Sequence, residues 1–225
     1  MKISKIYILF YFFTILLSGY ILPHWFILKQ SAEVRSKFNI GRFTFNSTAT
    51  LKEGDATIVC NLESTINKKE KDMDIKLTCD DSLSEFRFKD YKLVSQNIKS
   101  TGRYFIKPLT LFVENEEFIL PLPVSSERLR QRVCQIVDEC NNVRYKRLGG
   151  TINYQFYSNN KENYYMIEKE SFLPSALFIK EKNLSIESKK YYSFSPNIKF
   201  PSIIEIRNEK QHLIINVEDI DILNN

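Results

Sequence analysis

The stretch from residue 199 to residue 222 constrains the fold of this chain more than any other. It contains two runs in which apolar and polar residues alternate, and a polar turn at 208–211 separates them. With Ile206 placed opposite Leu213, the paired runs share one apolar face, which carries Ile204, Ile206, Leu213, Ile215 and Val217. This pattern is typical of an antiparallel hairpin with one buried face.

Similar alternating runs, separated by polar turns, recur from residue 38 onward. The chain is also rich in aromatic residues that favour strands, with 17 Phe and 12 Tyr. We therefore expect a mainly β fold with one or few helices, in which about 11–12 strands form a curved antiparallel sheet or incomplete β-barrel. The one clear helix is expected at 125–139, capped by Ser125 or Ser126.

The other alternating segments are assigned to strands, and they include 38–51, 56–66, 84–96, 103–113 and 117–122. Phe45 is expected to face Leu62 between the first two of these strands. Residues 84–96 are expected to form one strand with a bulge near Asp90. The last two segments are expected to pair as a hairpin.

The N-terminus carries an almost unbroken apolar run at 6–28, preceded by Lys2 and Lys5. One interpretation is a signal peptide with its apolar core at 6–17, cleaved near Gly19. The other is an uncleaved anchor in the inner membrane, because a run of this length can cross the bilayer. Either interpretation predicts an exported protein of the periplasm or cell envelope.

Composition and charge argue against several classes of function. The formal charge is +5, and it falls to +3 without Lys2 and Lys5, with basic residues scattered along the chain. This distribution does not indicate a nucleic-acid partner. No glycine-rich phosphate loop or metal-ligand spacing occurs, and the chain has only two histidines, so we expect no cofactor and no metal. His24 lies in the N-terminal apolar run and His212 on the polar face of a hairpin, so we do not expect an enzyme.

The four cysteines suggest disulfide bonds, because an exported protein meets an oxidising compartment. If the turn between the second and third strands is centred between Lys69 and Glu70, Cys60 lies directly opposite Cys79. We predict a disulfide there, with two buried free thiols as the alternative. Cys134 and Cys140 can bond only if the helix at 125–139 unwinds near its end.

The C-terminal third carries a family resemblance in a proline-led strand, a tyrosine-containing strand, a strand that begins Phe200-Pro201-Ser202 and a final alternating strand. These segments resemble the outer-membrane lipoprotein carrier and sorting superfamily (LolA/LolB-like). The resemblance implies one domain at 29–225, an incomplete barrel whose helices cover an apolar cavity for acyl chains. It implies lipid acyl chains or a lipoprotein as partners, in a transport or chaperone role.

Two features of that family are not readily placed in this chain. The helix that usually precedes the first strand would be shortened to 31–37 or replaced by the anchor. The arginine of the family's cavity cannot be assigned among Arg42, Arg87 and Arg103.

A strongly curved sheet has one concave apolar face, which an acyl chain could occupy. The candidate wall residues are Phe43, Phe45, Leu62, Phe86, Phe88, Tyr154 and Phe156. The alternative for these residues is an ordinary filled core. The alternative function is a structural or interaction module of an envelope assembly, anchored in the inner membrane through 6–28.

Overall fold

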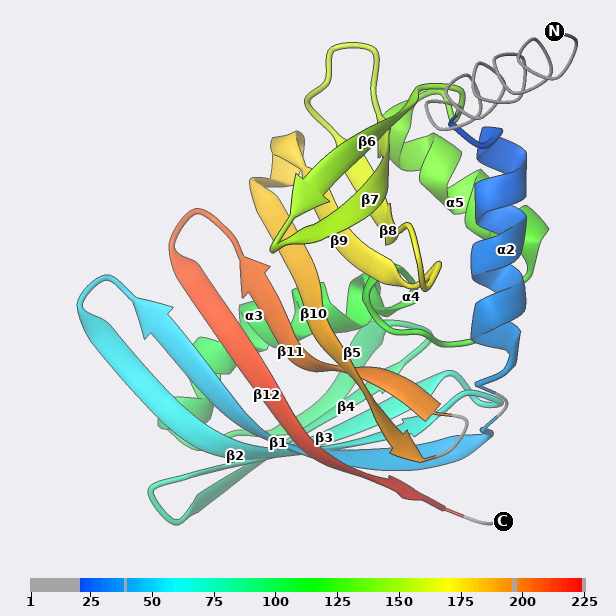
Figure 1. The fold of residues 1–225 in the computed structure, drawn as a ribbon. Coiled ribbons are helices and arrows are strands. Elements are labelled where there is room, and N and C mark those ends of the chain that lie inside the picture. The colour runs from blue at the N-terminus through cyan, green and yellow to red at the C-terminus, as the bar shows by residue number, and fades with distance from the viewer. Residues whose placement is uncertain (1–20, 39, 196–197, 224–225) are drawn as a thin grey trace, which may run out of the picture.

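Twelve strands form a single antiparallel sheet in the computed structural model, which describes residues 21–38, 40–195 and 198–223. The sheet is curved, and its edge strands β5 and β6 do not pair, so it forms an open half-barrel, as expected (Figure 1). Its strands are β1 (Arg42–Glu53), β2 (Ala56–Asn67), β3 (Asp72–Cys79), β4 (Ser82–Lys89), β5 (Lys92–Asn97), β6 (Val143–Leu148), β7 (Thr151–Tyr157), β8 (Tyr164–Glu168), β9 (Pro174–Ile179), β10 (Leu184–Ser195), β11 (Ile198–Arg207) and β12 (Gln211–Ile222).

The hairpin of β11 and β12 confirms the predicted register, since Ile206 pairs with Leu213 and Ile204 with Ile215. All four side chains are fully buried. The strand order is β5-β4-β3-β2-β1-β12-β11-β10-β9-β8-β7-β6, so every described pair except β1 with β12 joins consecutive strands. The half-barrel is therefore two runs of local hairpins joined along one long-range ladder.

Two of the strand assignments need correction, although both keep the same side chains inside. Phe45 pairs with Ser64 rather than with Leu62, because β1 continues to Glu53 and the turn is shorter than expected. The two-residue shift preserves the buried face, since side chains alternate with a period of two. The segment 84–96 is a hairpin of β4 and β5 rather than one bulged strand. Its turn residues Asp90 and Tyr91 both have positive φ angles, as tight hairpin turns require.

The predicted hairpin of 103–113 and 117–122 is wrong, because this part of the chain is helical. It forms η1 (Thr101–Phe105), α3 (Ile106–Glu114) and α4 (Glu116–Ile119), and α3 and α4 lie between the two sides of the curved sheet (Figure 1). The buried residues Leu109, Phe112 and Val113 recur at helical spacing, so they place one apolar stripe of α3 in the core.

The helix predicted at 125–139 is confirmed as α5 (Ser126–Val137). The Ser125 hydroxyl caps it by accepting a hydrogen bond from the Arg128 amide at 3.2 Å. A further helix, α2 (His24–Ser36), packs beside α5 (Figure 1). The helix before the first strand is thus neither replaced nor shortened to 31–37.

The position of α2 bears on the anchor interpretation. Ile27 and Leu28 were placed in the apolar run at 6–28, but their exposed fractions are 0% and 1% and they belong to the core. No helix within residues 21–38, 40–195 and 198–223 is long and apolar enough to cross a membrane. Most of the apolar run, residues 6–20, lies outside the described residues.

Both cysteine pairs form disulfides. Leu62 pairs with Leu77 in the predicted register, and the bond joins Cys60 and Cys79 across β2 and β3, with their Cα atoms 4.5 Å apart. The second bond joins Cys134 and Cys140, with Cα atoms 4.8 Å apart. It forms because α5 ends at Val137, and Asp138, with a φ angle of 62°, turns the chain back.

Replacing both Cys60 and Cys79 by alanine should lower the free energy of unfolding by about 3 kcal/mol, because the bond closes a loop of roughly 20 residues in the unfolded chain. Urea denaturation of the oxidised proteins measures this change. The matched control replaces Cys134 and Cys140, whose shorter loop should cost about 2 kcal/mol in the same treatment. Equal stability of the wild type before and after reduction would contradict both assignments.

Candidate functional site

The concave face of the half-barrel contains all seven residues predicted to line an acyl cavity. Each is at most 2% exposed, and all seven belong to one continuous core; they are Phe43, Phe45, Leu62, Phe86, Phe88, Tyr154 and Phe156. Among four cavities in the described part of the chain, one is lined by Phe86 and none by the other six. Contact of these residues with a ligand therefore stays a prediction.

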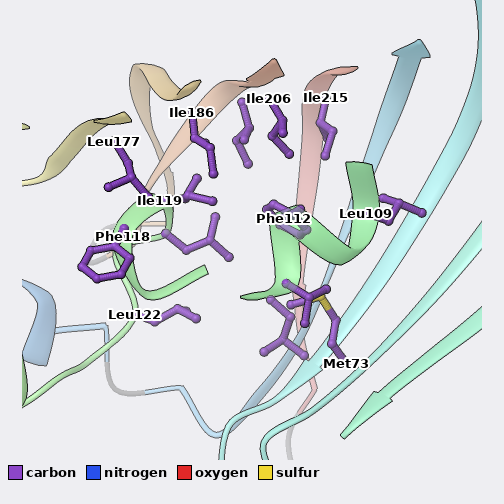
Figure 2. Close-up of a cluster of buried hydrophobic side chains, with 14 of the residues drawn as sticks. Met73, Leu109, Phe112, Phe118, Ile119, Leu122, Leu177, Ile186, Ile206 and Ile215 are labelled. Carbon is purple, nitrogen blue, oxygen red and sulfur yellow. The ribbon is translucent and has the colours of Figure 1, made fainter. Parts of the chain in front are cut away.

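The concave face is filled by the protein's own chain. We call residues 115–122, which comprise α4 and its flanks, the strap. Its buried side chains include Phe118, Ile119, Leu120 and Leu122. Figure 2 shows Phe118, Ile119 and Leu122 below Leu177 and Ile186 of the sheet, beside Phe112 of α3. The strap and α3 thus occupy the space that an acyl chain would need.

Arg35 of α2 holds the strap through its main chain. The side chain is completely buried. Its Nε donates to the Leu122 carbonyl at 2.8 Å, and its Nη2 donates to the Glu117 carbonyl at 2.7 Å. A four-residue helix leaves most of its carbonyls without helical partners, and the guanidinium supplies donors for this region. Burial lowers the pKa of Arg35, and nearby Tyr165, Tyr191 and Glu117 partly oppose the shift.

Sequence reasoning missed Arg35. Arg42, Arg87 and Arg103, the three arginines considered for a cavity role, are all exposed. The available signal was position, because Arg35 lies three and seven residues after the buried Ala32 and Leu28. A polar residue on the buried stripe of a helix calls for a buried partner.

Strand β10 also holds the strap. The Ser188 hydroxyl donates to the Ile119 carbonyl at 2.8 Å. The Tyr191 hydroxyl donates to the Pro174 carbonyl at 2.6 Å and lies 3.5 Å from the Ile119 carbonyl. These contacts, like those of Arg35, join side chains to the main chain and involve no strand ladder.

Charged groups on α5 restrain the N-terminal end of the strap. Arg128 and Arg132 approach the Glu117 carboxylate, with nitrogen–oxygen distances of 2.5 Å and 3.5 Å. Glu117 is mostly shielded from solvent, with a side-chain exposure of 13%, so this pairing is screened less than a surface ion pair. It adds electrostatic restraint to the main-chain contacts.

One cavity is lined by residues of the strap, and a second by the strand residues that hold the strap. The larger, of about 640 Å³, lies beside Ser188 and Tyr191, between the β6–β7 turn and the β8–β9 connection. Its wall includes Ser175, whose buried hydroxyl has no hydrogen-bond partner within the described chain. The smaller, of about 250 Å³, separates the strap from the β2–β3 turn. The larger falls in the size range of small-molecule sites, roughly 300–1,000 Å³.

Within the described residues, no cluster of three His, Cys, Asp or Glu side chains could hold a metal ion. His24 is the first residue of α2. His212 lies on the polar face of β12, within 3.4 Å of Glu205, and partial burial lowers its pKa.

No protein-family model matches the chain, and no curated protein matches it. Solved structures that are similar to it include a DUF1329 family protein from Desulfovibrio piger, 9% identical, with a TM-score of 0.49, covering 90% of this chain and 94% of that chain. Another is the LolA superfamily protein NE2245 from Nitrosomonas europaea, 11% identical, with a TM-score of 0.49, covering 91% and 96%. A third is a putative outer membrane lipoprotein-sorting protein domain from Vibrio parahaemolyticus, 11% identical, with a TM-score of 0.43, covering 86% and 91%. The similar structures thus include a LolA superfamily protein.

Proposed function

We propose that this protein is a non-catalytic protein of the cell envelope that binds an acyl chain, free or on a lipoprotein, on the concave face of its half-barrel. The observation that carries the proposal is the strap. Its apolar side chains fill the concave face, while side chains of α2 and β10 hold its main chain. The strap can therefore leave without breaking a strand pair.

An acyl chain would take the place of the strap's own side chains. Such an exchange replaces apolar contact with apolar contact, at roughly 25 cal/mol per Å² on each side, so the apolar contributions nearly cancel. The cost that remains is the loss of the polar contacts that hold the strap. The wall left behind is continuous, because Ile186, Ile206 and Ile215 lie side by side above the strap and α3 (Figure 2). This ligand class is the one that the sequence resemblance implies.

Export to the envelope is the second part of the proposal. The described cysteines are all paired in disulfides, and such bonds persist in oxidising compartments. The apolar run after Lys2 and Lys5 supplies a sequence signal for export. The concave face would then meet acyl chains outside the cytosol.

Replacing Arg35 by methionine should release the strap and increase binding of a fluorescent fatty acid. The carbonyls of Glu117 and Leu122 lose their donors, and each unpaired buried group costs about 1–3 kcal/mol in the closed form. A shift of about 1.4 kcal/mol corresponds to a tenfold change, so we expect binding about tenfold tighter or more. Fluorescence titration measures affinity, and hydrogen exchange of the strap amides reports release.

Arg103→Met is the matched control, because it removes the same charge from an exposed position and should change neither measurement. Ser188→Ala is a milder second variant that removes the donor to Ile119 and should act in the same direction. Absence of probe binding by the wild type and by both strap variants, with the fold retained, would refute the proposal.

A further inference from the structure

The smaller cavity beside the strap has an apolar floor and a charged rim. Its floor is built from buried Ile66, Met73, Val113 and Leu122. Its volume of about 250 Å³ exceeds the roughly 150 Å³ of an apolar cavity that takes a benzene molecule. The space suits a compact head group together with the first carbons of a chain.

Two ionisable side chains line the cavity without a hydrogen-bond or ion-pair partner among the described residues. They are the side chains of Lys68, in the β2–β3 turn, and Glu116, at the start of α4. Burial lowers the pKa of Lys68 to about 8, and nearby Arg35 lowers it as well. Burial also raises the pKa of Glu116 to about 7, with Glu117 adding to the shift. At neutral pH Glu116 is thus partly protonated, whereas Lys68 is still mostly charged.

Most of the other charged groups around the cavity already have partners, the exception being Asp72, whose buried Oδ1 has no hydrogen-bond partner among the described residues. Arg128 pairs with Glu117 and also donates to the Tyr91 hydroxyl, at 3.4 Å. Lys71 lies 3.6 Å from Asp90. Six charged or titratable groups from six different elements face Lys68 and Glu116. They are Arg35 of α2, Lys71 of the β2–β3 turn, Asp72 at the start of β3, Tyr91 of the β4–β5 turn, Glu117 of α4 and Arg128 of α5.

This arrangement favours an anion over a cation. Arg35 is a completely buried cation whose contacts are carbonyls rather than carboxylates, and its Nη1 has no hydrogen-bond partner among the described residues. A cationic head group would have to lie near Arg35 and Lys68, where like charges repel. An anionic oxygen could instead accept from the Lys68 ammonium and from the protonated Glu116 carboxyl.

We propose that this cavity binds the anionic head of a single-chain amphiphile, with Lys68 and Glu116 contacting the head and Ile66, Met73, Val113 and Leu122 contacting the first part of the chain. The cavity exists with the strap in place, so the site does not depend on opening of the concave face. It adds a head-group site to the protein.

The affinity for an anionic head should depend on pH. Below about pH 7, Glu116 is protonated and Lys68 is charged, so both act as donors. As the pH rises through about 7, Glu116 acquires a negative charge, and through about 8 Lys68 loses its positive charge. Both changes weaken the binding of an anion.

Calorimetric titration of the full chain with decanesulfonate, which stays anionic throughout, tests the site. We expect decanesulfonate to bind at about pH 6 and to bind about tenfold more weakly, or weaker still, at about pH 9. The reason is the loss of at least one charge-assisted hydrogen bond. Decanoate should behave in the same way, whereas decyl maltoside and inorganic phosphate should bind far more weakly. The first comparison ligand lacks the charge and the second lacks the chain.

Lys68→Met should weaken decanesulfonate binding about tenfold or more at about pH 6. Glu116→Gln should retain binding and remove the step near pH 7, while the step near pH 8 from Lys68 remains. Lys69→Met, at the exposed neighbouring lysine, is the matched control and should bind like the wild type. The proposal would be overturned if Lys68→Met and the wild type bound decanesulfonate equally. It would also be overturned if the wild type bound decyl maltoside, or free phosphate, as tightly as decanesulfonate. Arg35→Met reports the strap separately, through hydrogen exchange of the strap amides, a measurement that does not need Lys68.

Discussion

Truncation of Phe112 to alanine is expected to lower the free energy of unfolding by about 3–5 kcal/mol, the usual cost of deleting a buried ring. The side chain is fully buried on α3 and packs edge-on against Phe45, with ring centroids 6.4 Å apart. Figure 2 shows it between Ile206 and Ile215 on one side and Met73 on the other. The surrounding sheet cannot collapse fully into the space that the ring leaves. Urea denaturation of the purified variant measures the loss.

The same variant tests whether the concave face accepts an apolar ligand. A dry cavity of this kind binds benzene, so benzene should raise the melting temperature of Phe112→Ala and not that of the wild type. Tyr104→Ala is the matched control, because its ring in η1 is 54% exposed and its loss should change stability by about 0.5 kcal/mol or less. A cost below about 1 kcal/mol for Phe112→Ala would show that α3 does not pack on the sheet as described.

Replacement of Leu28 by alanine should cost about 2–5 kcal/mol, since the side chain is buried where α2 meets the core. This result separates two roles for the end of the N-terminal apolar run. A residue inside a membrane anchor would leave the stability of the folded domain unchanged. A residue of the core must affect it. Chemical denaturation again provides the measurement.

Trp25→Ala is the control on the same helix, because Trp25 is 53% exposed and its loss should change stability by about 0.5 kcal/mol or less. The opposite pattern, with Leu28→Ala neutral and Trp25→Ala destabilising, would place the other face of α2 against the domain. Membrane association lost in Leu28→Ala without a change in stability would restore the anchor interpretation for residues 24–28.

Features set by short-range pattern were predictable from the sequence. The register of β11 with β12 follows from apolar residues that alternate on both sides of one turn. The Cys60–Cys79 bond follows from the same rule applied to β2 and β3. Each depends on a few residues close together in the chain, so the position of the turn and the alternation of side chains were sufficient to predict it.

The helical segment from Thr101 to Ile119 was not predictable in this way. Short apolar runs rich in aromatic and β-branched residues fit a strand or a buried helix equally well by local preference. The curved sheet decides between them, because its concave face needs a cover whose buried backbone groups are hydrogen-bonded: α3 satisfies them internally, and Arg35 and Ser188 supply donors to the strap. The same residues in a flat sheet protein could have paired as a hairpin.

The site depended most on tertiary structure. The sequence by itself determined which residues turn inward, since all seven predicted wall residues are buried. Only the tertiary structure decided that the strap lies against that wall, that Arg35 of α2 reaches the carbonyls of Glu117 and Leu122 some 80 residues away, and that Lys68 shares a cavity with Glu116. The physical reason is that side-chain alternation is a local property of the backbone, whereas a buried charge finds its partners through the packing of elements distant in sequence.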